Sequence, residues 1–263
     1  MSGLTRRTLA VCALAAVTLG NPLLLHAQDK PCAAVLLHGK WGNPQPMVFF
    51  GRKLEPYCVF KSVEMPWSQR RNYDATYPAA LDDVGAQVRT FREQGYKRVV
   101  LIGQSFGANA AMAYMADRGD VDAVVAMSPG HTPALWYERS LTKSAVDQAR
   151  DLVSQGKPGE TLTLEDVNQG QRRNFRMQAD VLLSFFDPKG LGDIPRSVET
   201  FKKPVPFMWV MGSADGTFRI TGEAVYNKAP AHPRSQYLVM EADHMSLQDV
   251  AAPKVLEWIK ALD

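Results

Sequence analysis

Ser105, Asp215 and His244 are residues of the types that together make a hydroxyl group nucleophilic. Serine alone is a weak nucleophile, so it needs a base within hydrogen-bond reach. The base in turn needs a carboxylate that fixes its tautomer and stabilises its cation. The three residues occur in the order serine, acid, histidine, which is one of the known orders of such triads. They can act together only if the fold brings their side chains to one place.

Ser105 lies in Gly103–Gly107, a match to the pattern Gly-x-Ser-x-Gly. The apolar, β-branched run Val99–Ile102 predicts a buried strand before it, and the small and apolar residues from Ala108 onward predict a helix after it. A strand that turns into a helix so quickly strains the backbone of the serine, and the two glycines leave that turn unobstructed. The alternative is a glycine-rich turn with a serine that only forms hydrogen bonds. We favour an exposed serine hydroxyl at the carboxyl edge of a sheet.

Strands and helices alternate along the chain, which predicts a parallel sheet with right-handed crossovers and helices on both faces. We expect a three-layer α/β/α fold whose mostly parallel sheet has about six strands. The expected strands are 33–37, 57–65, 99–102, 121–127, 205–211 and 236–240, and the expected helices are 46–54, 79–94, 141–154, 175–186, 222–227 and 253–262, besides the helix after Ser105.

The pattern is looser between residues 131 and 203, where we expect two helices, at 141–154 and 175–186. Insertions on parallel sheets often carry specificity, so we interpret this segment as a helical cap over the site. The alternative is that these are ordinary crossover helices packed on the sheet.

The predicted strands place all three reactive residues at one edge of the sheet. Ser105 follows 99–102, Asp215 follows 205–211 and His244 follows 236–240. In open α/β sheets ligands bind outside the carboxyl ends of the strands. The sequence therefore predicts that the three side chains meet there.

These features resemble the α/β-hydrolase fold family over residues 33–262. The residues that carry the resemblance are His38-Gly39, Gly103–Gly107, Gly212-x-x-Asp215 and Asp243-His244. Family members usually have two further strands before the His-Gly strand, and no room remains for them here. The resemblance therefore implies a trimmed version of the fold, with about six strands.

The resemblance also implies the roles of individual residues. Ser105 would be the nucleophile, Asp215 the acid and His244 the general base. The N–H of Phe106 and an N–H from the loop after the first strand would bind the oxyanion, and Lys40 is the expected donor in that loop, with its neighbour Trp41 as the other candidate.

Other residues have simpler interpretations, with some alternatives left open. We expect His38 to hold its loop by hydrogen bonds and Asp243 to be part of loop structure. Asp187 is the alternative acid, because the position of the acid varies among such triads. Aromatic residues at strand ends could line an apolar acyl pocket or belong to the core; the pocket candidates are Trp41, Trp67 and Trp136, with Phe106.

The composition excludes several classes of protein. The chain has 263 residues and a formal net charge of +3, and Arg6 and Arg7 supply two of those charges. The rest is close to neutral, so we expect no nucleic-acid partner. Cys58, His131 and His232 show no spacing typical of metal ligands, and we expect neither a metal nor a cofactor.

The first 27 residues have the order of a secretory signal: two arginines, an apolar run over 9–19 and a small residue, Ala27, at the expected cleavage position. A membrane anchor is the alternative, but Gly20-Asn21-Pro22 interrupts the run and it is short for a bilayer span. We expect a mature chain of residues 28–263, without a stable membrane span, that is periplasmic or secreted.

The mature chain would keep two cysteines, Cys32 and Cys58. An even number of cysteines in an exported protein suggests a disulfide. Each cysteine lies at the start of a predicted strand, so parallel neighbouring strands would bring both sulfurs to the same end of the sheet. Two free buried thiols are the alternative.

Together these observations predict an exported serine hydrolase that cleaves ester-like bonds of a small-molecule substrate through an acyl-enzyme intermediate. A thioesterase or lipase and a proline-type aminopeptidase could use the same triad. A binding protein that kept the fold without turnover is a further alternative, because a fold does not by itself define a function.

Overall fold

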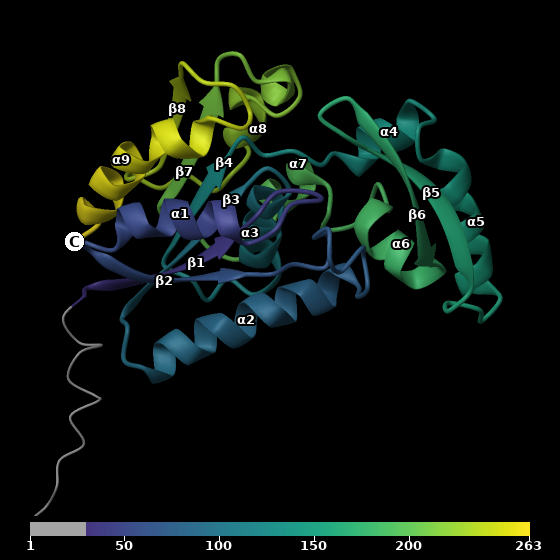
Figure 1. Cartoon of the computed structure of the whole chain (residues 1–263), viewed down its shortest axis with the longest axis horizontal. Coiled ribbons are helices and arrows are strands. Elements are labelled where there is room, and N and C mark those ends of the chain that lie inside the picture. Colours follow the sequence, from purple (N-terminus) through teal and green to yellow (C-terminus); the bar gives the residue numbers. More distant parts are fainter. Residues whose placement is uncertain (1–29) are drawn as a thin grey trace, which may run out of the picture.

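The computed structural model describes residues 30–263 (Figure 1). The expected signal at residues 1–27 therefore lies outside the described residues. Within residues 30–263, none of the helices combines the length and the apolar composition that a membrane crossing requires.

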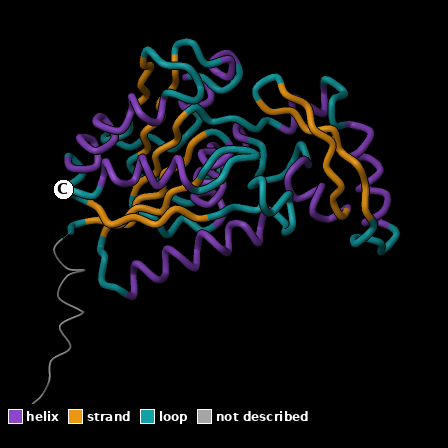
Figure 2. Tube along the Cα trace, in the orientation of Figure 1, coloured by secondary structure: helices purple, strands orange, loops and turns teal. Residues whose placement is uncertain are grey.

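A six-stranded parallel sheet forms the centre of the molecule, with the strand order β2-β1-β3-β4-β7-β8. The four central strands, β1, β3, β4 and β7, are apolar runs whose side chains are buried on both faces, whereas the edge strands β2 and β8 are partly exposed. Figure 2 shows the twisted sheet between helices, which confirms the three-layer α/β/α prediction. The strands are β1 (Cys32–Leu37), β2 (Cys58–Val63), β3 (Arg98–Gln104), β4 (Ala123–Met127), β7 (Phe207–Gly212) and β8 (Gln236–Met240).

The two faces of the sheet bury different helices. One core contains α1 (Gln45–Leu54) and α9 (Leu247–Lys260), and the other contains α2 (Tyr77–Glu93) and α3 (Phe106–Asp117). Alternate residues of β1 enter the two cores, as the period of a strand requires. Shorter helices complete the fold: α7 (Ile194–Glu199), α8 (Glu223–Tyr226) and the 3₁₀ turn η2 (Gly216–Arg219).

The last helix begins earlier than the sequence predicted. We expected it to begin at Pro253 and to end at Leu262. Instead α9 begins at Leu247 and contains Pro253 in its interior. The buried residues Leu247 and Ala251 precede the proline and pack into the core, and this burial offsets the backbone hydrogen bond that the proline cannot donate.

The segment between β4 and β7 is an insertion that lies beside the carboxyl ends of the strands (Figure 1). The insertion contains helices at both predicted places, and it also contains a two-stranded antiparallel hairpin that the sequence analysis did not predict. The elements of this segment that precede α7 are α4 (Pro133–Glu138), α5 (Lys143–Ser154), β5 (Thr161–Asn168), β6 (Gln171–Gln178) and α6 (Ala179–Phe186).

The helix expected at 175–186 therefore begins only at Ala179, because residues 171–178 pair with β5. The hairpin turns at Gln169 and Gly170, whose φ angles are 49° and 77°. Two consecutive positive φ angles match the right-handed twist of the flanking strands and favour a two-residue hairpin. The pair Gln169-Gly170 is a weaker turn signal than Asn-Gly.

Cys32 and Cys58 form a disulfide between β1 and β2. The two cysteines are directly opposite each other in the register of these parallel strands. The bond closes a chain segment with a sequence separation of 26 residues, which contains α1.

Replacing both cysteines, as Cys32→Ala/Cys58→Ala, should lower the free energy of unfolding by about 3 kcal/mol, because the unfolded chain loses a cross-link across this segment. Urea unfolding of the oxidised wild-type protein and of the variant measures the difference. Reduction of the wild-type protein should reproduce most of the loss. A change below about 1 kcal/mol in both experiments would contradict the prediction.

Candidate functional site

The backbone at Ser105 is strained by the turn from β3 into α3. Its φ and ψ are 56° and −119°, outside the regions that residues with a side chain normally adopt. At two positions of this turn, a glycine lies in close contact with another backbone segment. A Cβ atom on Gly103 would lie 2.1 Å from the carbonyl oxygen of Gly107, and one on Gly107 would lie 2.1 Å from the carbonyl oxygen of Leu37. Only glycine fits at either position, so the hydroxyl-bearing residue is held between fixed backbone segments.

A buried hydrogen bond joins the loops after β7 and β8. Nδ1 of His244 lies 2.8 Å from Oδ2 of Asp215, although the two residues are 29 positions apart. The carboxylate can only accept at this oxygen, so Nδ1 carries the proton and Nε2 is left with a lone pair. The imidazole therefore has the tautomer that a general base requires.

The second oxygen of Asp215 is also occupied. Oδ1 accepts hydrogen bonds from the backbone N–H and the hydroxyl of Thr217, at 2.8 and 2.9 Å. Burial by itself would raise the pKa of Asp215, but the hydrogen bonds from His244 and Thr217 outweigh it and lower the pKa to about 2. Asp215 is thus a carboxylate at every pH near neutrality.

Ser105 and His244 line the same cavity, which has a volume of about 310 Å³. Within residues 30–263 no hydrogen bond joins the Ser105 hydroxyl to the imidazole of His244. Proton transfer between them needs an approach to about 2.6–3.2 Å, and such contacts are often long without substrate. The structure thus brings the two side chains to the lining of one cavity.

The loop after β1 lies across this cavity and holds two candidate oxyanion donors. The N–H of Trp41 donates to the carbonyl oxygen of Trp67 at 2.9 Å and is therefore occupied. In the part of the chain that the structure describes, the N–H groups of Lys40 and Phe106 donate to no protein oxygen. Between Lys40 and Trp41, the structure leaves only the N–H of Lys40 free for a ligand.

His38 fixes the start of this loop. Its Nε2 accepts from the N–H of Met65 at 3.1 Å, and its Nδ1 donates to the carbonyl oxygen of Gly39 at 2.8 Å. Burial lowers the pKa of His38, in keeping with a neutral ring that uses one nitrogen as acceptor and the other as donor. Its contacts are those expected of a residue that holds the loop.

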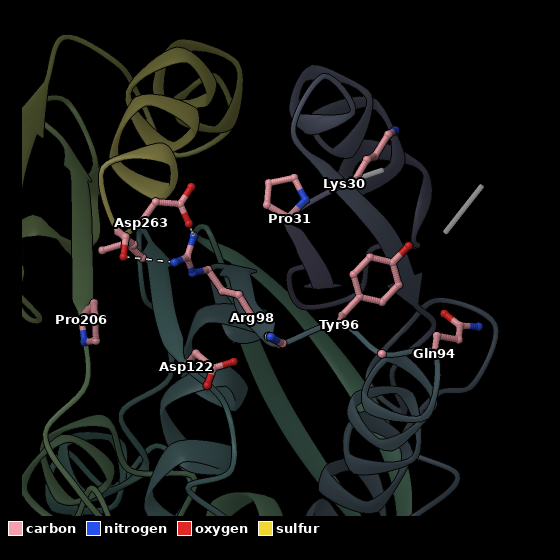
Figure 3. Close-up of a pocket in the computed structure, with 11 residues that line it drawn as sticks. Lys30, Pro31, Gln94, Tyr96, Arg98, Asp122, Pro206 and Asp263 are labelled. Carbon is pink, nitrogen blue, oxygen red and sulfur yellow. Dashed lines mark hydrogen bonds and ion pairs between the residues drawn. The ribbon is translucent and has the colours of Figure 1, made fainter. Parts of the chain in front are cut away.

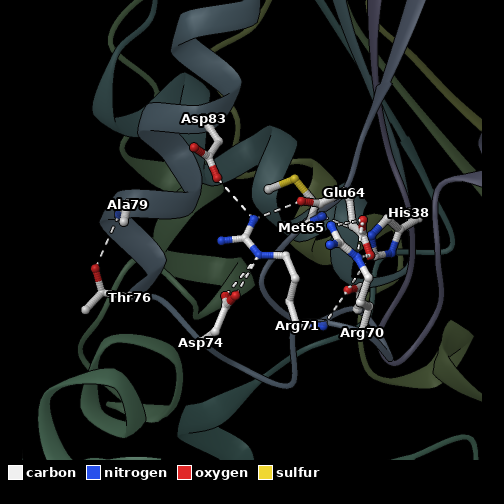
Figure 4. A network of polar contacts seen from close by, with 10 residues as sticks. His38, Glu64, Met65, Arg70, Arg71, Asp74, Thr76, Ala79 and Asp83 are labelled. Atoms are coloured by element: carbon white, nitrogen blue, oxygen red, sulfur yellow. Dashed lines mark hydrogen bonds and ion pairs between the residues drawn. The ribbon is translucent and has the colours of Figure 1, made fainter.

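A polar network orders the segment after β2 that supports His38 (Figure 4). The guanidinium of Arg71 contacts the backbone carbonyl of Glu64, the carboxylate of Asp74 and the carboxylate of Asp83. Arg70 forms an ion pair with the side chain of Glu64. These contacts tie the loop to the start of α2 and so fix the backbone of Met65 and Trp67.

Asp166 in β5 is the site residue that sequence reasoning missed. It is buried and forms an ion pair with Nζ of Lys40 at 2.7 Å. Its other oxygen accepts from the indole N–H of Trp41 at 3.2 Å and from the hydroxyl of Tyr73 at 2.8 Å. No short-range pattern indicates this role, because Asp166 lies 126 residues after Lys40. One carboxylate thus joins the insertion to the loop of candidate oxyanion donors.

The predicted pocket residues differ in their positions. Trp136 and Trp41 each line a cavity beside Ser105. Trp67 is fully buried and stacks on the ring of Phe106, with ring centres 4.5 Å apart, so it belongs to the core and lines neither cavity. The ring of Phe106 is likewise fully buried, which leaves only its backbone N–H for the site.

The alternative carboxylates are occupied elsewhere. Asp187 forms an ion pair with Arg150 of α5 at 3.0 Å. Asp243 is exposed and accepts hydrogen bonds from the backbone of Met245 and Ser246, so it shapes the loop that carries His244. Asp215 is the carboxylate that contacts the imidazole of His244.

A larger cavity, of about 820 Å³, opens at the opposite end of the sheet, near the start of β3 (Figure 3). Arg98 forms an ion pair there with Asp263, and Lys30 and Tyr96 lie around the opening. Among the residues that the structure describes, its lining contains no serine, cysteine or histidine, so this part of the lining lacks a nucleophile and a base of the kind found at Ser105. Across residues 30–263, no three His, Cys, Asp or Glu side chains are grouped so that they could hold a metal ion.

Known proteins share the fold of this chain. A family model described as "Alpha/beta hydrolase family" matches residues 34–259. No curated protein sequence matches the chain significantly.

Several solved structures have the same fold. A hypothetical protein from Pseudomonas aeruginosa has a TM-score of 0.64 and 17% identity, with 89% of this chain and 85% of that chain covered. A monoacylglycerol lipase from Paleococcus ferrophilus has a TM-score of 0.61 and 17% identity, with 88% and 95% covered. Est1E from Butyrivibrio proteoclasticus, with ferulic acid bound, has a TM-score of 0.59 and 15% identity, with 88% and 89% covered.

Asp166→Asn should lower the free energy of unfolding by about 3–5 kcal/mol, because it leaves the buried ammonium of Lys40 without a countercharge. The double variant Lys40→Met/Asp166→Asn should be more stable than the single variant, since it removes the uncompensated charge. Urea unfolding of the two single variants and the double variant measures the coupling. Additive losses would contradict the prediction.

Asp215 should stabilise the fold in a pH-dependent way. Its pKa of about 2 in the folded state is below the ordinary value of 3.8. The contribution of the Asp215 carboxylate to the free energy of unfolding is therefore nearly complete above about pH 4 and is lost as the pH falls through 2. The free energy of unfolding of the wild-type protein, relative to Asp215→Asn, should therefore fall by about 2 kcal/mol between pH 5 and pH 2. Chemical unfolding of both proteins from pH 5 to pH 2 measures this change. If the difference in the free energy of unfolding between the two proteins stays constant over this range, the prediction is wrong.

Proposed function

The chain belongs to the alpha/beta hydrolase family, and we propose that it is a serine hydrolase that cleaves carboxylic esters of small molecules. Ser105 is the nucleophile, His244 the general base and Asp215 the acid that orients the base. The observation that carries the proposal is the buried Asp215–His244 hydrogen bond beside a serine in a strained turn.

In the proposed reaction, the Ser105 oxygen attacks the ester carbonyl carbon while His244 accepts the hydroxyl proton. The negative oxygen of the tetrahedral intermediate accepts hydrogen bonds from the N–H groups of Phe106 and Lys40. His244 then donates its proton to the leaving alcohol, and the acyl group remains on Ser105. A water molecule activated by His244 releases the acid.

The start of α3 supports negative charge at this position. Phe106 is the first residue of the helix, so its N–H has no partner within the helix and points out of its N-terminus. The helix dipole favours an anion there. Removing one donor of this kind costs about 3 kcal/mol of transition-state stabilisation.

The residues around Ser105 favour esters over peptides with a free amino terminus. A proline-type aminopeptidase would need a carboxylate to bind the substrate amine. Among the described residues that line the two cavities at Ser105, none is an aspartate or a glutamate. Asp166 lies behind the lining and is already paired with Lys40.

We also propose that the protein is exported. The Cys32–Cys58 disulfide supports this, because structural disulfides persist in oxidising compartments. The signal-like order of residues 1–27 supports it independently.

A fluorophosphonate probe should label Ser105, and Ser105→Ala should abolish both labelling and ester hydrolysis because the variant has no nucleophile. Mass spectrometry of the labelled peptide identifies the site, and hydrolysis of p-nitrophenyl acetate measures the activity. Asp215→Asn should lower kcat by roughly 10⁴-fold, because the imidazole loses the group that fixes its tautomer.

Two matched controls separate these effects from general damage. Ser154→Ala changes an exposed serine of α5, and Asp187→Asn changes the carboxylate paired with Arg150. Both should keep labelling and turnover near the wild-type level. Labelling of Ser105 without turnover of any ester, thioester or peptide would refute the enzyme proposal and favour a binding protein.

A further inference from the structure

Two cavities of different character meet at Ser105. The small cavity has a volume of about 120 Å³ and extends toward His131 and Trp136. The large cavity has a volume of about 310 Å³ and extends toward His244. Ser105, Lys40 and the hairpin residues Asn168 and Gln169 line both. A substrate whose ester carbonyl lies at Ser105 must therefore place one side of the ester in each cavity.

The position of His244 determines which cavity holds the acyl part of the ester and which holds the alcohol part. The base that takes the proton from Ser105 must then give it to the oxygen of the leaving alcohol. His244 lines the large cavity and is absent from the lining of the small one. The alcohol therefore lies in the large cavity, and the acyl group lies in the small one.

The small cavity limits the acyl group by its size. A protein cavity of about 150 Å³ holds one benzene molecule, so 120 Å³ leaves room for about five non-hydrogen atoms. Its walls are fixed by packing: the Nζ atom of Lys40 lies 4.5 Å from the ring centre of Trp136, and His131 stacks on Phe106 with ring centres 4.1 Å apart. This space suits an acetyl to butyryl group.

The large cavity is lined by an unusual number of side-chain amides, six in all: Asn43, Gln69, Gln104, Asn168, Gln169 and Gln248. Three of them, Gln69, Gln169 and Gln248, form no side-chain hydrogen bond with any part of the chain that the structure describes. A carboxamide offers both donors and an acceptor, which matches the hydroxyl group.

The charges of the large cavity also limit its ligand. It has no carboxylate among its described lining residues, and its one ammonium group, that of Lys40, is paired with Asp166. A charged alcohol would find no countercharge there. The apolar side chains of Pro46, Met47 and Met245 complete the lining and offer surface for the C–H groups of a ring.

We propose, on the basis of the function proposed above, that the protein removes short acyl groups from uncharged polyhydroxylated alcohols, such as sugars. The oxygen of Ser105 first adds to the acyl carbon to give the tetrahedral intermediate, and the C–O bond to the sugar breaks when this intermediate collapses. The proton from Ser105 passes through His244 to the leaving sugar oxygen. Water then releases the short acid from Ser105.

Kinetics on two matched series test the proposal. Among p-nitrophenyl acetate, butyrate and octanoate, kcat/KM should fall by at least about tenfold from acetate to octanoate, because the longer chain exceeds the small cavity. Between a monosaccharide monoacetate and ethyl acetate, kcat/KM should be higher for the sugar ester by about tenfold. An octanoate value equal to or above the acetate value would overturn the acyl assignment, and an equal or higher value for ethyl acetate would overturn the sugar assignment.

Variants test each cavity separately. Trp136→Ala enlarges the small cavity and should raise the octanoate-to-acetate ratio of kcat/KM by about tenfold. Gln248→Leu removes one unpaired amide and should lower kcat/KM for the sugar acetate about fivefold relative to p-nitrophenyl acetate. Gln148→Leu makes the same change on the exposed face of α5, outside both cavities, and should leave this ratio unchanged.

The outcomes separate the two proposals. Absence of both Ser105 labelling and hydrolysis of all these esters would refute the hydrolase function itself. Hydrolysis with equal losses on the sugar acetate and p-nitrophenyl acetate in Gln248→Leu would overturn only the sugar assignment. If that variant does not fold, Gln69→Leu, which alters an exposed side chain of the same cavity, serves as the second test.

Discussion

The arrangement of the site depends on the close approach of α3 to the end of β1. A Cβ atom on Gly107 would lie 2.1 Å from the carbonyl oxygen of Leu37, so any side chain there would push the helix away from the sheet. This approach bends the chain sharply at Ser105 and places the N–H of Phe106 beside the loop of Lys40. The two candidate oxyanion donors lie on different segments, which approach each other here through backbone contact without an intervening side chain.

A second constraint acts from the other side of the cavity. The buried carboxylate of Asp166 contacts Lys40, Trp41 and Tyr73, so the insertion and the loop after β1 hold each other in place. An ion pair of this kind contributes little net stability, because both charges lose their hydration, but breaking it is costly. The hairpin residues Asn168 and Gln169 are thereby held beside Ser105, where they line two cavities of different size and polarity.

Most of the sheet was predictable, because its strands are continuous apolar runs separated by helices with a clear period. The prediction failed where two signals competed. Residues 175–178 have the composition of a helix start, yet they pair with β5. Pro253 appeared to begin a helix, yet packing of Leu247 and Ala251 extends the helix before it. In both cases contacts with distant residues outweighed a local preference.

The sequence by itself determined the strand–turn–helix at Ser105 and the positions of Asp215 and His244 after two later strands, because turn chemistry and hydrophobic periodicity act over a few residues. Whether these residues are catalytic stays a prediction. Only the tertiary structure decided that Trp41 rather than Lys40 uses its N–H within the fold, that Trp67 belongs to the core, and that Asp166 meets Lys40 across 126 residues. Such contacts depend on how the insertion folds back over the sheet, and no local pattern in the chain encodes that path.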